Sequence, residues 1–206
     1  MSDVIITPPF RISFPSLFVA TAFQDGPLKF SVVAIWNTED VKGKYREDWG
    51  QLVTALDQKS RGFFDTPLSK LPANFRRGIH NGNEKAHLGG YGEGTLFANL
   101  SSDRKPQVVD LSKVVIPDGD TDRIYPGAWA RASVGVYAFD NIGKGVAIGL
   151  NNVQWLGHGE RLDSRTDAAD DFAADPDREW YDRADIADAR GETAAPADDF
   201  DDDLPF

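Results

Sequence analysis

The chain has 206 residues and a formal net charge of −11 at pH 7, a length that suits one domain with an appendage or two small domains. It has no cysteine, which excludes disulfide bonds, thiol nucleophiles and thiolate zinc sites and is typical of a reducing compartment. Residues 163–206 hold 16 acidic residues against four arginines, whereas residues 1–162 hold 17 acidic and 18 basic residues. We therefore expect a near-neutral folded domain over residues 1–162 and an acidic tail over residues 163–206.

The tail is dominated by Asp, Ala, Arg and Glu, with too few large apolar side chains to offset the entropy of ordering it. We expect residues 163–206 to be disordered. The start of the chain, MSDVIITPPFR, lacks a basic region followed by an apolar segment, and no apolar run approaches the roughly 20 residues of a membrane span. We therefore expect a cytoplasmic protein that binds no membrane.

The first elements expected along the chain are two strands joined by a turn. Residues 11–23 and 28–36 are rich in β-branched and aromatic side chains and are separated by QDGP, a pattern typical of a hairpin. Pro15 should lie at a bend or an edge, because it cannot donate a ladder hydrogen bond. A helix follows up to about Gly62, since Trp49, Leu52 and Leu56 repeat at helical spacing.

The second half of the domain begins with an irregular, glycine-rich stretch over residues 65–94, of a length that is usually either functional or mobile. Residues 95–102 then indicate a strand, residues 107–116 a short extended segment, and residues 127–140 and 146–156 a second hairpin around NIGKG. About five strands, one helix and short turns predict an all-β, mainly antiparallel domain that forms a small closed or nearly closed barrel.

The alternation in GAWARASVGVYAFD, residues 127–140, separates two faces of one strand. Alanine and valine fill one face, and the other carries Trp129, Arg131, Ser133, Tyr137 and Phe139. Aromatic rings beside a cation suit single-stranded nucleic acid, because rings stack on bases and cations pair with phosphates. The alternative is that the side of this strand with Trp129, Tyr137 and Phe139 fills the core of the barrel, with Arg131 near its rim.

Further basic residues occur in short clusters, several of them beside an aromatic residue. A single cluster is most simply a solvated surface, but together they supply enough cations to follow a phosphate backbone. Tyr91 lies between glycines in a loop that could close over a ligand, whereas Tyr45 and Trp49 are better explained as helix core. The aromatic residues considered as stacking partners are Trp36, Tyr45, Phe75, Tyr91 and Phe97. The predicted DNA-binding residues are Lys42, Lys44, Arg46, Arg76, Arg77, Lys85, Tyr91, Arg104, Lys105, Trp129, Arg131 and Tyr137.

Patterns typical of catalysis or metal binding are incomplete in this sequence. His80, His87 and His158 include no pair at the i, i+4 spacing of a helical zinc site. PDGDTD begins like a calcium loop, but its sixth and twelfth ligand positions are Arg123 and Trp129 rather than Gly and Glu. GGYGEG lacks the Lys-Ser/Thr of a phosphate-binding loop, and no serine has a G-x-S-x-G setting. We expect no enzyme, no metal and no cofactor, with a two-metal nuclease built from dispersed carboxylates as an alternative.

The last nine residues, DDFDDDLPF, resemble the acidic tip of bacterial single-stranded DNA-binding proteins, in which acidic residues precede an aliphatic residue, Pro and Phe. The body instead resembles a family of phage-encoded single-stranded DNA-binding proteins over most of residues 10–165. This similarity is carried by GTLFANLSSDRKPQVVD, IYPGAWARASVGVYAFDN and GKGVAIGLNNVQWLGHGERLDSR. The resemblance implies an OB-fold-like five-stranded barrel, with one or more helices inserted, that coats single-stranded DNA without sequence preference during phage replication, recombination and repair in the host cytoplasm.

The acidic tail then has two expected roles. Carboxylates tethered beside a basic groove compete with DNA at an effective concentration of about millimolar for a flexible linker, so the free protein should hold its groove partly occupied. Once DNA displaces the tail, its tip should recruit replication or recombination proteins by filling a pocket lined with basic residues. An alternative function is a DNA mimic, in which the tail occupies the basic site of a host nucleic-acid enzyme. The residues expected to bind a partner are Asp201, Asp202, Asp203, Leu204, Pro205 and Phe206.

Overall fold

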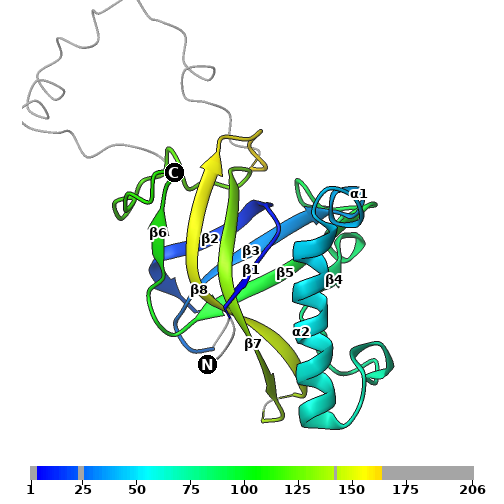
Figure 1. Cartoon of the computed structure of the whole chain (residues 1–206). Helices are drawn as coiled ribbons and strands as arrows, with labels where there is room; N and C mark the ends of the chain where they lie inside the picture. The colour runs from blue at the N-terminus through cyan, green and yellow to red at the C-terminus, as the bar shows by residue number, and fades with distance from the viewer. Residues whose placement is uncertain (1–3, 23–25, 142, 164–206) are drawn as a thin grey trace, which may run out of the picture. The chain divides into compact units, whose positions relative to one another are not determined.

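The computed structural model describes residues 4–22, 26–141 and 143–163 of the chain. Strands dominate this part, and its helices occur between β3 and β5 (Figure 1). The predicted tail beyond Asp163 lies outside the described residues. The elements are β1 (Ile5–Ile6), β2 (Phe10–Thr21), β3 (Lys29–Asn37), α1 (Thr38–Lys42), α2 (Arg46–Phe64), the 3₁₀ helix η1 (Leu68–Lys70), β4 (His80–Asn81), the 3₁₀ helix η2 (Gly82–Lys85), β5 (Thr95–Ser102), β6 (Gln107–Val109), β7 (Trp129–Phe139) and β8 (Gly145–Gly157).

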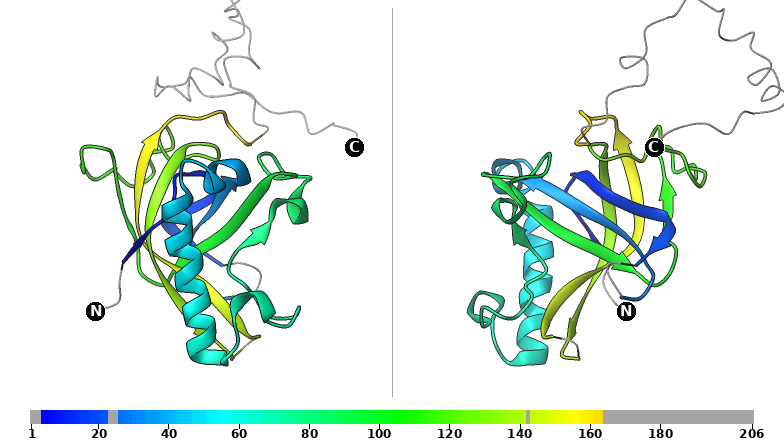
Figure 2. Two further views of the ribbon diagram at one scale, coloured as in Figure 1. Left: turned by 45° about the vertical axis from the view of Figure 1, so that its right-hand side comes forward. Right: turned by 180° about the vertical axis from the view of Figure 1, so that it is seen from behind.

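Five of the strands pair in a closed circuit. β2 pairs with β3, β3 with β5, β5 with β8 and β8 with β7, and β7 returns to β2. Seen from two further directions, β2, β3 and β5 cross the β7–β8 hairpin, and α2 runs along one side of the sheet (Figure 2). Short pairings add β1 to β7, β4 to β5 and β6 to β8.

The sheet is mixed rather than purely antiparallel. The pairs β2–β3 and β7–β8 are antiparallel, which confirms both predicted hairpins. However, β5 and β6 each run parallel to β8, and parallel neighbours require a long crossover connection. The alternation of side chains within a strand shows its two faces but not the direction of its neighbour, so the sequence pattern did not reveal the parallel pairs.

The predicted helix is confirmed as α2, which extends two residues past Gly62. It ends where Asp65 adopts a left-handed conformation with φ 51° and its N–H bonds to the carbonyl of Arg61. Leu52 and Leu56 are fully buried and face the sheet, and burying each contributes about 1.5–3 kcal/mol. The helix therefore closes one side of the core.

Trp36 lies at the centre of this core. Its side chain is 2 % exposed, and its ring meets Phe10 and Trp49 edge-on at centroid distances of 5.9 and 5.3 Å. Its Nε1 donates to the carbonyl of Pro8 at 3.3 Å. Trp36 is therefore a core residue and not a stacking partner for bases.

The two faces of β7 divide between core and surface. Ala130, Ala132 and Val134 are at most 1 % exposed and belong to the core. Arg131 and Tyr137 point to solvent from the other face. The alternative in which the aromatic residues of segment 127–140 fill the core is therefore wrong. The aromatic residues of β7 lie on the outside of the sheet.

Candidate functional site

A bulge in β2 places Phe14 on the outside of the sheet. Ser13 pairs with Val33 and Ser16 with Ser31, so Phe14 and Pro15 together lie opposite one residue of β3. The ladder breaks here because Pro15 has no N–H to donate, which confirms the expected bend. Phe14 adopts φ 44° and is 54 % exposed, an unfavourable conformation for a bulky residue. The bulge thus holds an aromatic ring in solvent.

One row of side chains crosses the outer face of five strands. Trp129 of β7 pairs with Arg11 of β2, Arg11 with Ile35 of β3, Ile35 with Phe97 of β5, and Phe97 with His80 of β4. Residues directly opposite in a ladder project from the same face of the sheet. The row therefore brings together residues that are far apart in the sequence: Arg11 and Trp129 are separated by 118 positions.

Tyr91 covers the middle of this row. Its ring meets Phe97 edge-on at 5.4 Å, and it packs on a small apolar cluster formed by Val33, Ile35 and Phe97. Its hydroxyl donates to Oγ of Ser13 at 3.1 Å. Burial raises the pKa of the Tyr91 phenol, against the smaller opposing effect of the Ser13 hydrogen bond. The predicted ligand contact is thus part of the surface that faces solvent above β3 and β5.

Lys85 lies among the rings of this surface. Its Nζ is 4.8 Å from the ring centroid of Phe97, 5.6 Å from that of Tyr91 and 5.7 Å from that of Phe14, which are cation–π distances. The capping box of η2, made by Asn81 and Glu84, fixes the backbone that carries Lys85. We call the set of Phe14, His80, Lys85, Tyr91 and Phe97 the aromatic face.

Arg11 and Trp129 form the other end of the row. The Arg11 guanidinium lies 5.3 Å from the Trp129 ring centroid, and its Nε donates to the carbonyl of Gly127 at 2.5 Å. Its Nη2 donates to the carbonyl of Glu160. Trp129, a predicted DNA contact, is therefore only partly exposed and lies under a cation. Arg11 was not among the predicted residues.

Three predicted cations lie at the junction of α1 and α2. Lys44 pairs with Asp40 at 3.2 Å and lies 4.9 Å from the ring of Tyr45. The hydrogen bond to Asp40 raises the pKa of the Lys44 ammonium. Lys42 and Arg46 are exposed on either side. These side chains are available to solvent, but no described contact joins them to the aromatic face.

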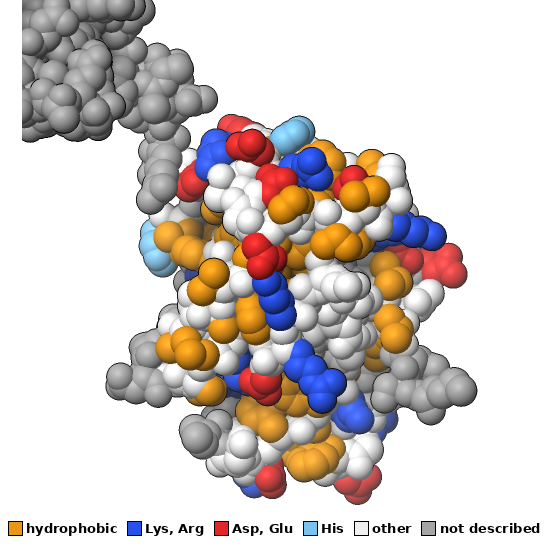
Figure 3. Space-filling view, turned by 90° about the vertical axis from the view of Figure 1, so that its left-hand side faces the viewer, with side chains coloured by type: hydrophobic (Ala, Val, Ile, Leu, Met, Phe, Trp, Pro, Cys, Tyr) orange, Lys and Arg blue, Asp and Glu red, His pale blue; other side chains and the backbone are white. Residues whose placement is uncertain are grey.

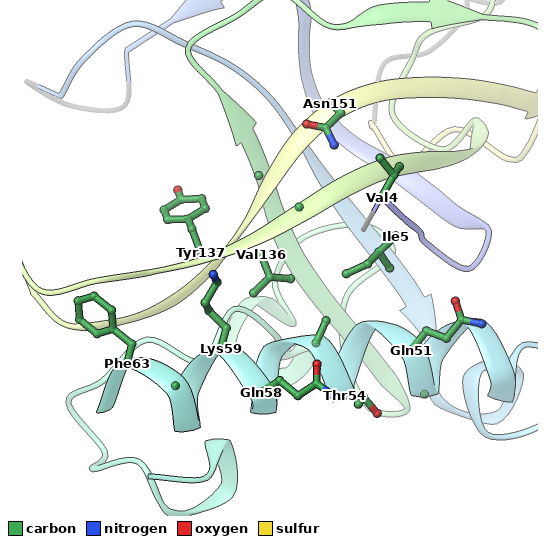
Figure 4. Close-up of a pocket in the computed structure, with 15 residues that line it drawn as sticks. Val4, Ile5, Gln51, Thr54, Gln58, Lys59, Phe63, Val136, Tyr137 and Asn151 are labelled. Carbon is green, nitrogen blue, oxygen red and sulfur yellow. The ribbon is translucent and has the colours of Figure 1, made fainter. Parts of the chain in front are cut away.

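Arg76, Arg77 and Tyr137 lie near the end of the β7–β8 hairpin. Arg76 forms a bridge with Gly145, while the Arg77 guanidinium donates to the carbonyl of Leu71 at 2.7 Å and so holds its own loop. Tyr137 borders a groove of about 1100 Å³ between α2 and the hairpin. Figure 4 shows Lys59 and Phe63 of α2 on the opposite wall of this groove. Among the described residues that line the groove, Lys59 is the only charged one, so this part of the surface is poorly suited to a phosphate chain.

The remaining predicted DNA-binding residues have no described contact with the aromatic face. Arg131 bonds through Nε to Oε1 of Gln154 at 2.8 Å. Arg104 and Lys105 lie in the turn after β5, where Lys105 pairs with Asp118. Six predicted residues of the tip lie outside the described part: Asp201, Asp202, Asp203, Leu204, Pro205 and Phe206. Of the predicted DNA-binding residues, Lys85 and Tyr91 lie together in the aromatic face, with Nζ of Lys85 5.6 Å from the Tyr91 ring centroid.

Four contributors to the site were not in the predicted set of DNA-binding residues: Arg11, Phe14, His80 and Phe97. Phe97 had been noted only as a possible stacking partner. A Phe-Pro step inside a strand was the available signal for Phe14, because proline forces a bulge there. Figure 3 shows one side of the molecule, on which hydrophobic side chains reach the surface with Lys and Arg side chains between them.

Two of the three acidic residues of PDGDTD pair with basic side chains. Asp118 pairs with Lys105, and Asp120 lies 3.5 Å from Nε of Arg123. Across the described ranges, no three His, Asp or Glu side chains gather so that they could hold a metal ion. No described helix is long and apolar enough to cross a membrane.

Comparison with known proteins gives both a family and a fold. A family model described as "Enterobacter phage Enc34, ssDNA-binding protein" matches residues 3–182. A curated relative, "Putative protein p50" of Acyrthosiphon pisum secondary endosymbiont phage 1, is 34% identical over 84 residues, which are 40% of this chain and 43% of that protein. The chain thus matches less than half the length of this relative.

Solved structures of a phage protein share the fold. The single-stranded DNA-binding protein from bacteriophage Enc34 in complex with ssDNA superposes with a TM-score of 0.62 at 17% identity, over 77% of this chain and 88% of that one. Another structure of the Enc34 protein gives a TM-score of 0.59 at 16% identity, over 82% and 89% of the two chains. Because the family model spans most of the sequence, this chain belongs to the family of the Enterobacter phage Enc34 ssDNA-binding protein.

Proposed function

We propose that this protein binds single-stranded DNA without sequence preference during phage replication, recombination and repair in the host cytoplasm, and that the aromatic face is its contact surface. The observation that carries the proposal is the position of Lys85, whose Nζ lies 4.8–5.7 Å from the rings of Phe14, Tyr91 and Phe97. Rings that stack on any base, beside a cation that pairs with any phosphate, bind single strands without reading their sequence.

The strand circuit supports an OB-fold. In an OB-fold, a five-stranded barrel binds oligonucleotides on the face of its second and third strands and through the loops at their ends. Counted around the circuit from β2, the second and third strands are β3 and β5. Their outer face carries Val33, Ile35 and Phe97. This arrangement supports the aromatic face as the DNA-binding surface.

Other predicted basic residues are proposed to contact phosphates outside the aromatic face. Lys42, Lys44, Arg46, Arg104 and Arg131 are exposed cations that can pair with phosphates as the strand leaves the aromatic face. Each such contact strengthens binding and increases its dependence on salt without adding sequence preference. Because Arg77 donates to the carbonyl of Leu71, its replacement is expected to disturb the loop as well as DNA binding.

Replacement of Tyr91 tests the proposed surface. Tyr91→Ala removes the ring and is expected to weaken binding of a fluorescent single-stranded oligonucleotide by about 1–3 kcal/mol, the range for one base stacked on an aromatic ring. Tyr91→Phe keeps the ring and loses only the hydrogen bond to Ser13, so it should bind nearly as the unaltered protein does. A folded Tyr91→Ala variant with unchanged affinity would place the binding surface elsewhere.

We further propose that residues 163–206 compete with DNA and that the segment from Asp201 to Phe206 recruits replication or recombination proteins. The charge of this part of the chain, 16 acidic residues against four arginines, favours such competition with a polyanion. Truncation after Asp163 should tighten binding to single-stranded DNA, most strongly at low salt, because screening weakens the competition. Equal or weaker affinity of the truncated chain at matched ionic strength would contradict competition.

A further inference from the structure

We propose that the apolar cluster on the outer face of β3 and β5 is a nucleobase-binding pocket that Leu162 occupies in the free protein. Single-stranded DNA then reaches the pocket by displacing residues 158–163, which we call the strap. This inference rests on the proposed function and names the residue that a base replaces.

The cluster is covered although it lies outside the main core. Val33, Ile35 and Phe97 are 8, 4 and 6 % exposed, yet they project from the side of the sheet opposite to Val32, Ala34 and Trp36. Among the described residues, the partly buried hydrophobic side chains that pack on the cluster are Tyr91, from the glycine-rich loop, and Leu162, from the strap. Leu162 therefore supplies apolar cover at the centre of the face on which an OB-fold binds oligonucleotides.

Apart from Leu162, the strap is held by hydrogen bonds and by ring contacts around Tyr125. The His158 ring is stacked on Tyr125 at 6.0 Å and meets Trp155 edge-on at 5.2 Å, and the Arg161 guanidinium lies 4.8 Å from the Tyr125 ring centroid. The N–H of Leu162 donates to the carbonyl of Pro126 at 3.0 Å. Gly159 exchanges two hydrogen bonds with the Tyr125 hydroxyl, at 2.9 and 3.0 Å, and the carbonyl of Glu160 accepts from Arg11. Each such bond contributes about 0.5–1.5 kcal/mol net. Displacement of the strap therefore costs these hydrogen bonds and ring contacts, and a ligand that stacks on rings and pairs with cations offsets that cost with contacts of the same kinds.

The sequence leaves room for the strap by omitting side chains beneath it. A Cβ atom at Gly90 would lie 2.7 Å from Cδ1 of Leu162, and Cβ atoms at Gly89 and Gly127 would overlap the strap backbone. Gly90 also has φ 83°, a conformation that favours glycine. The glycine-rich loop and the strap thus fit each other closely, as two parts of one cover over the cluster.

The side chains around Leu162 suit a base. Phe97 and Tyr91 present aromatic carbon, His80 is stacked on Phe97, and Lys85 lies at the rim, 4.8 Å from the Phe97 ring. Leucine fills apolar space but cannot stack with a ring, whereas every nucleobase has a π-face. Displacement of Leu162 by a base therefore exchanges one apolar contact for a stacked one beside a cation.

A disulfide that fixes the strap tests the inference directly. The chain has no cysteine, so the double variant Gly90→Cys, Leu162→Cys carries only the two introduced thiols. The ideal Cβ at Gly90 lies 3.3 Å from Cγ of Leu162, the position that Sγ of a cysteine at residue 162 can take, and a disulfide holds its two Cβ atoms about 3.5–4.5 Å apart. Oxidised and reduced samples of this one protein are compared in titrations with a fluorescent single-stranded oligonucleotide. Any strain from cysteine at Gly90 is common to both.

The oxidised sample is expected to bind at least about tenfold more weakly than the reduced one, because a base stack is lost. Equal affinity, with the bridge confirmed by mass spectrometry, would overturn the inference while leaving DNA binding intact. If neither redox state nor the unaltered chain bound single strands, the proposed function itself would be wrong.

Leu162→Ala gives a second test that needs no bridge. Removing the occupant lowers the cost of displacement, so the variant should bind single-stranded DNA severalfold more tightly. Leu111→Ala is the matched control, since Leu111 is 61 % exposed in the turn after β6 and should leave affinity unchanged. A folded Leu162→Ala variant that bound equally or more weakly would show that Leu162 is a fixed part of the fold, against the inference.

Discussion

The imidazole of His80 is stacked on the phenyl ring of Phe97, with ring centroids 5.1 Å apart and planes 19° from parallel. Phe97 is 6 % exposed, whereas the side chain of His80 is 38 % exposed. The buried ring thus fixes the orientation of an accessible one, and an oriented ring loses little entropy when a ligand stacks on it.

His80→Ala should therefore weaken binding of single-stranded DNA by about 1–3 kcal/mol. His80→Phe keeps a ring on Phe97 and should retain most of the affinity. Both are measured by fluorescence anisotropy at one fixed salt concentration. If the alanine and phenylalanine variants lost affinity equally, the imidazole would be acting through charge or hydrogen bonds rather than as a stacking surface.

Lys85 is expected to pair with a phosphate when DNA binds. Lys85→Gln should weaken binding and lower the slope of log K against log salt by about 0.7, the value for one phosphate contact on a single strand. Lys59→Gln is the control, because Lys59 lines the separate groove beside α2. A slope that stays the same in Lys85→Gln would mean that Lys85 does not contact phosphate.

Two tryptophans should separate stability from binding. Trp36→Ala empties a site that is 2 % exposed and should lower the free energy of unfolding by about 3–5 kcal/mol. Trp129→Ala removes a half-buried ring on the outer face and should mainly lower DNA affinity. Urea denaturation and oligonucleotide titration of both variants check this division. A Trp129 variant that unfolds as readily as the Trp36 variant would make Trp129 a core residue.

Asp57 makes folding stability depend on pH. Its Oδ2 accepts from Nε of Arg61 at 2.5 Å and its Oδ1 from the N–H of Leu68 at 2.8 Å. Both hydrogen bonds lower the pKa of the Asp57 carboxyl, and the bond from Arg61 has the larger effect. A lowered pKa in the folded state stabilises the fold above the ordinary aspartate value of about 3.9, and this contribution is lost as the pH falls through the folded-state pKa.

Asp57→Asn should accordingly melt at a lower temperature than the unaltered protein at pH 7, and the difference should shrink towards pH 3. Thermal denaturation followed by circular dichroism at both values checks this. A difference that grows on acidification would have the wrong sign for a carboxylate that is stabilised by folding.

The sequence predicted where strands and helices lie along the chain better than it predicted which strands pair with each other. Residues 95–102 were expected as a strand and form β5, because β-branched and apolar residues mark a strand locally. The row from His80 to Trp129 was not foreseen, since strand pairing between distant segments leaves no local pattern. His80 in particular belongs to β4, a strand of two residues inside a glycine-rich stretch.

Charge in the sequence indicated DNA binding without giving the place. Lys85 and Tyr91 were predicted separately and lie together, 5.6 Å from ammonium to ring centroid. Lys44 and Lys105 instead pair with Asp40 and Asp118. A basic residue on a surface has the same sequence signature whether its partner is a carboxylate of the same chain or a phosphate, and only the fold separates the two.

Titration of the complete chain with single-stranded and duplex oligonucleotides of equal length, over a range of salt concentrations, tests the central claim most directly. Binding through rings and cations predicts a preference for the single strand, because duplex bases are already stacked, together with an affinity that falls linearly on a log–log plot against salt. Absence of binding to the single strand even in dilute buffer, or equal affinity for the duplex, would contradict it.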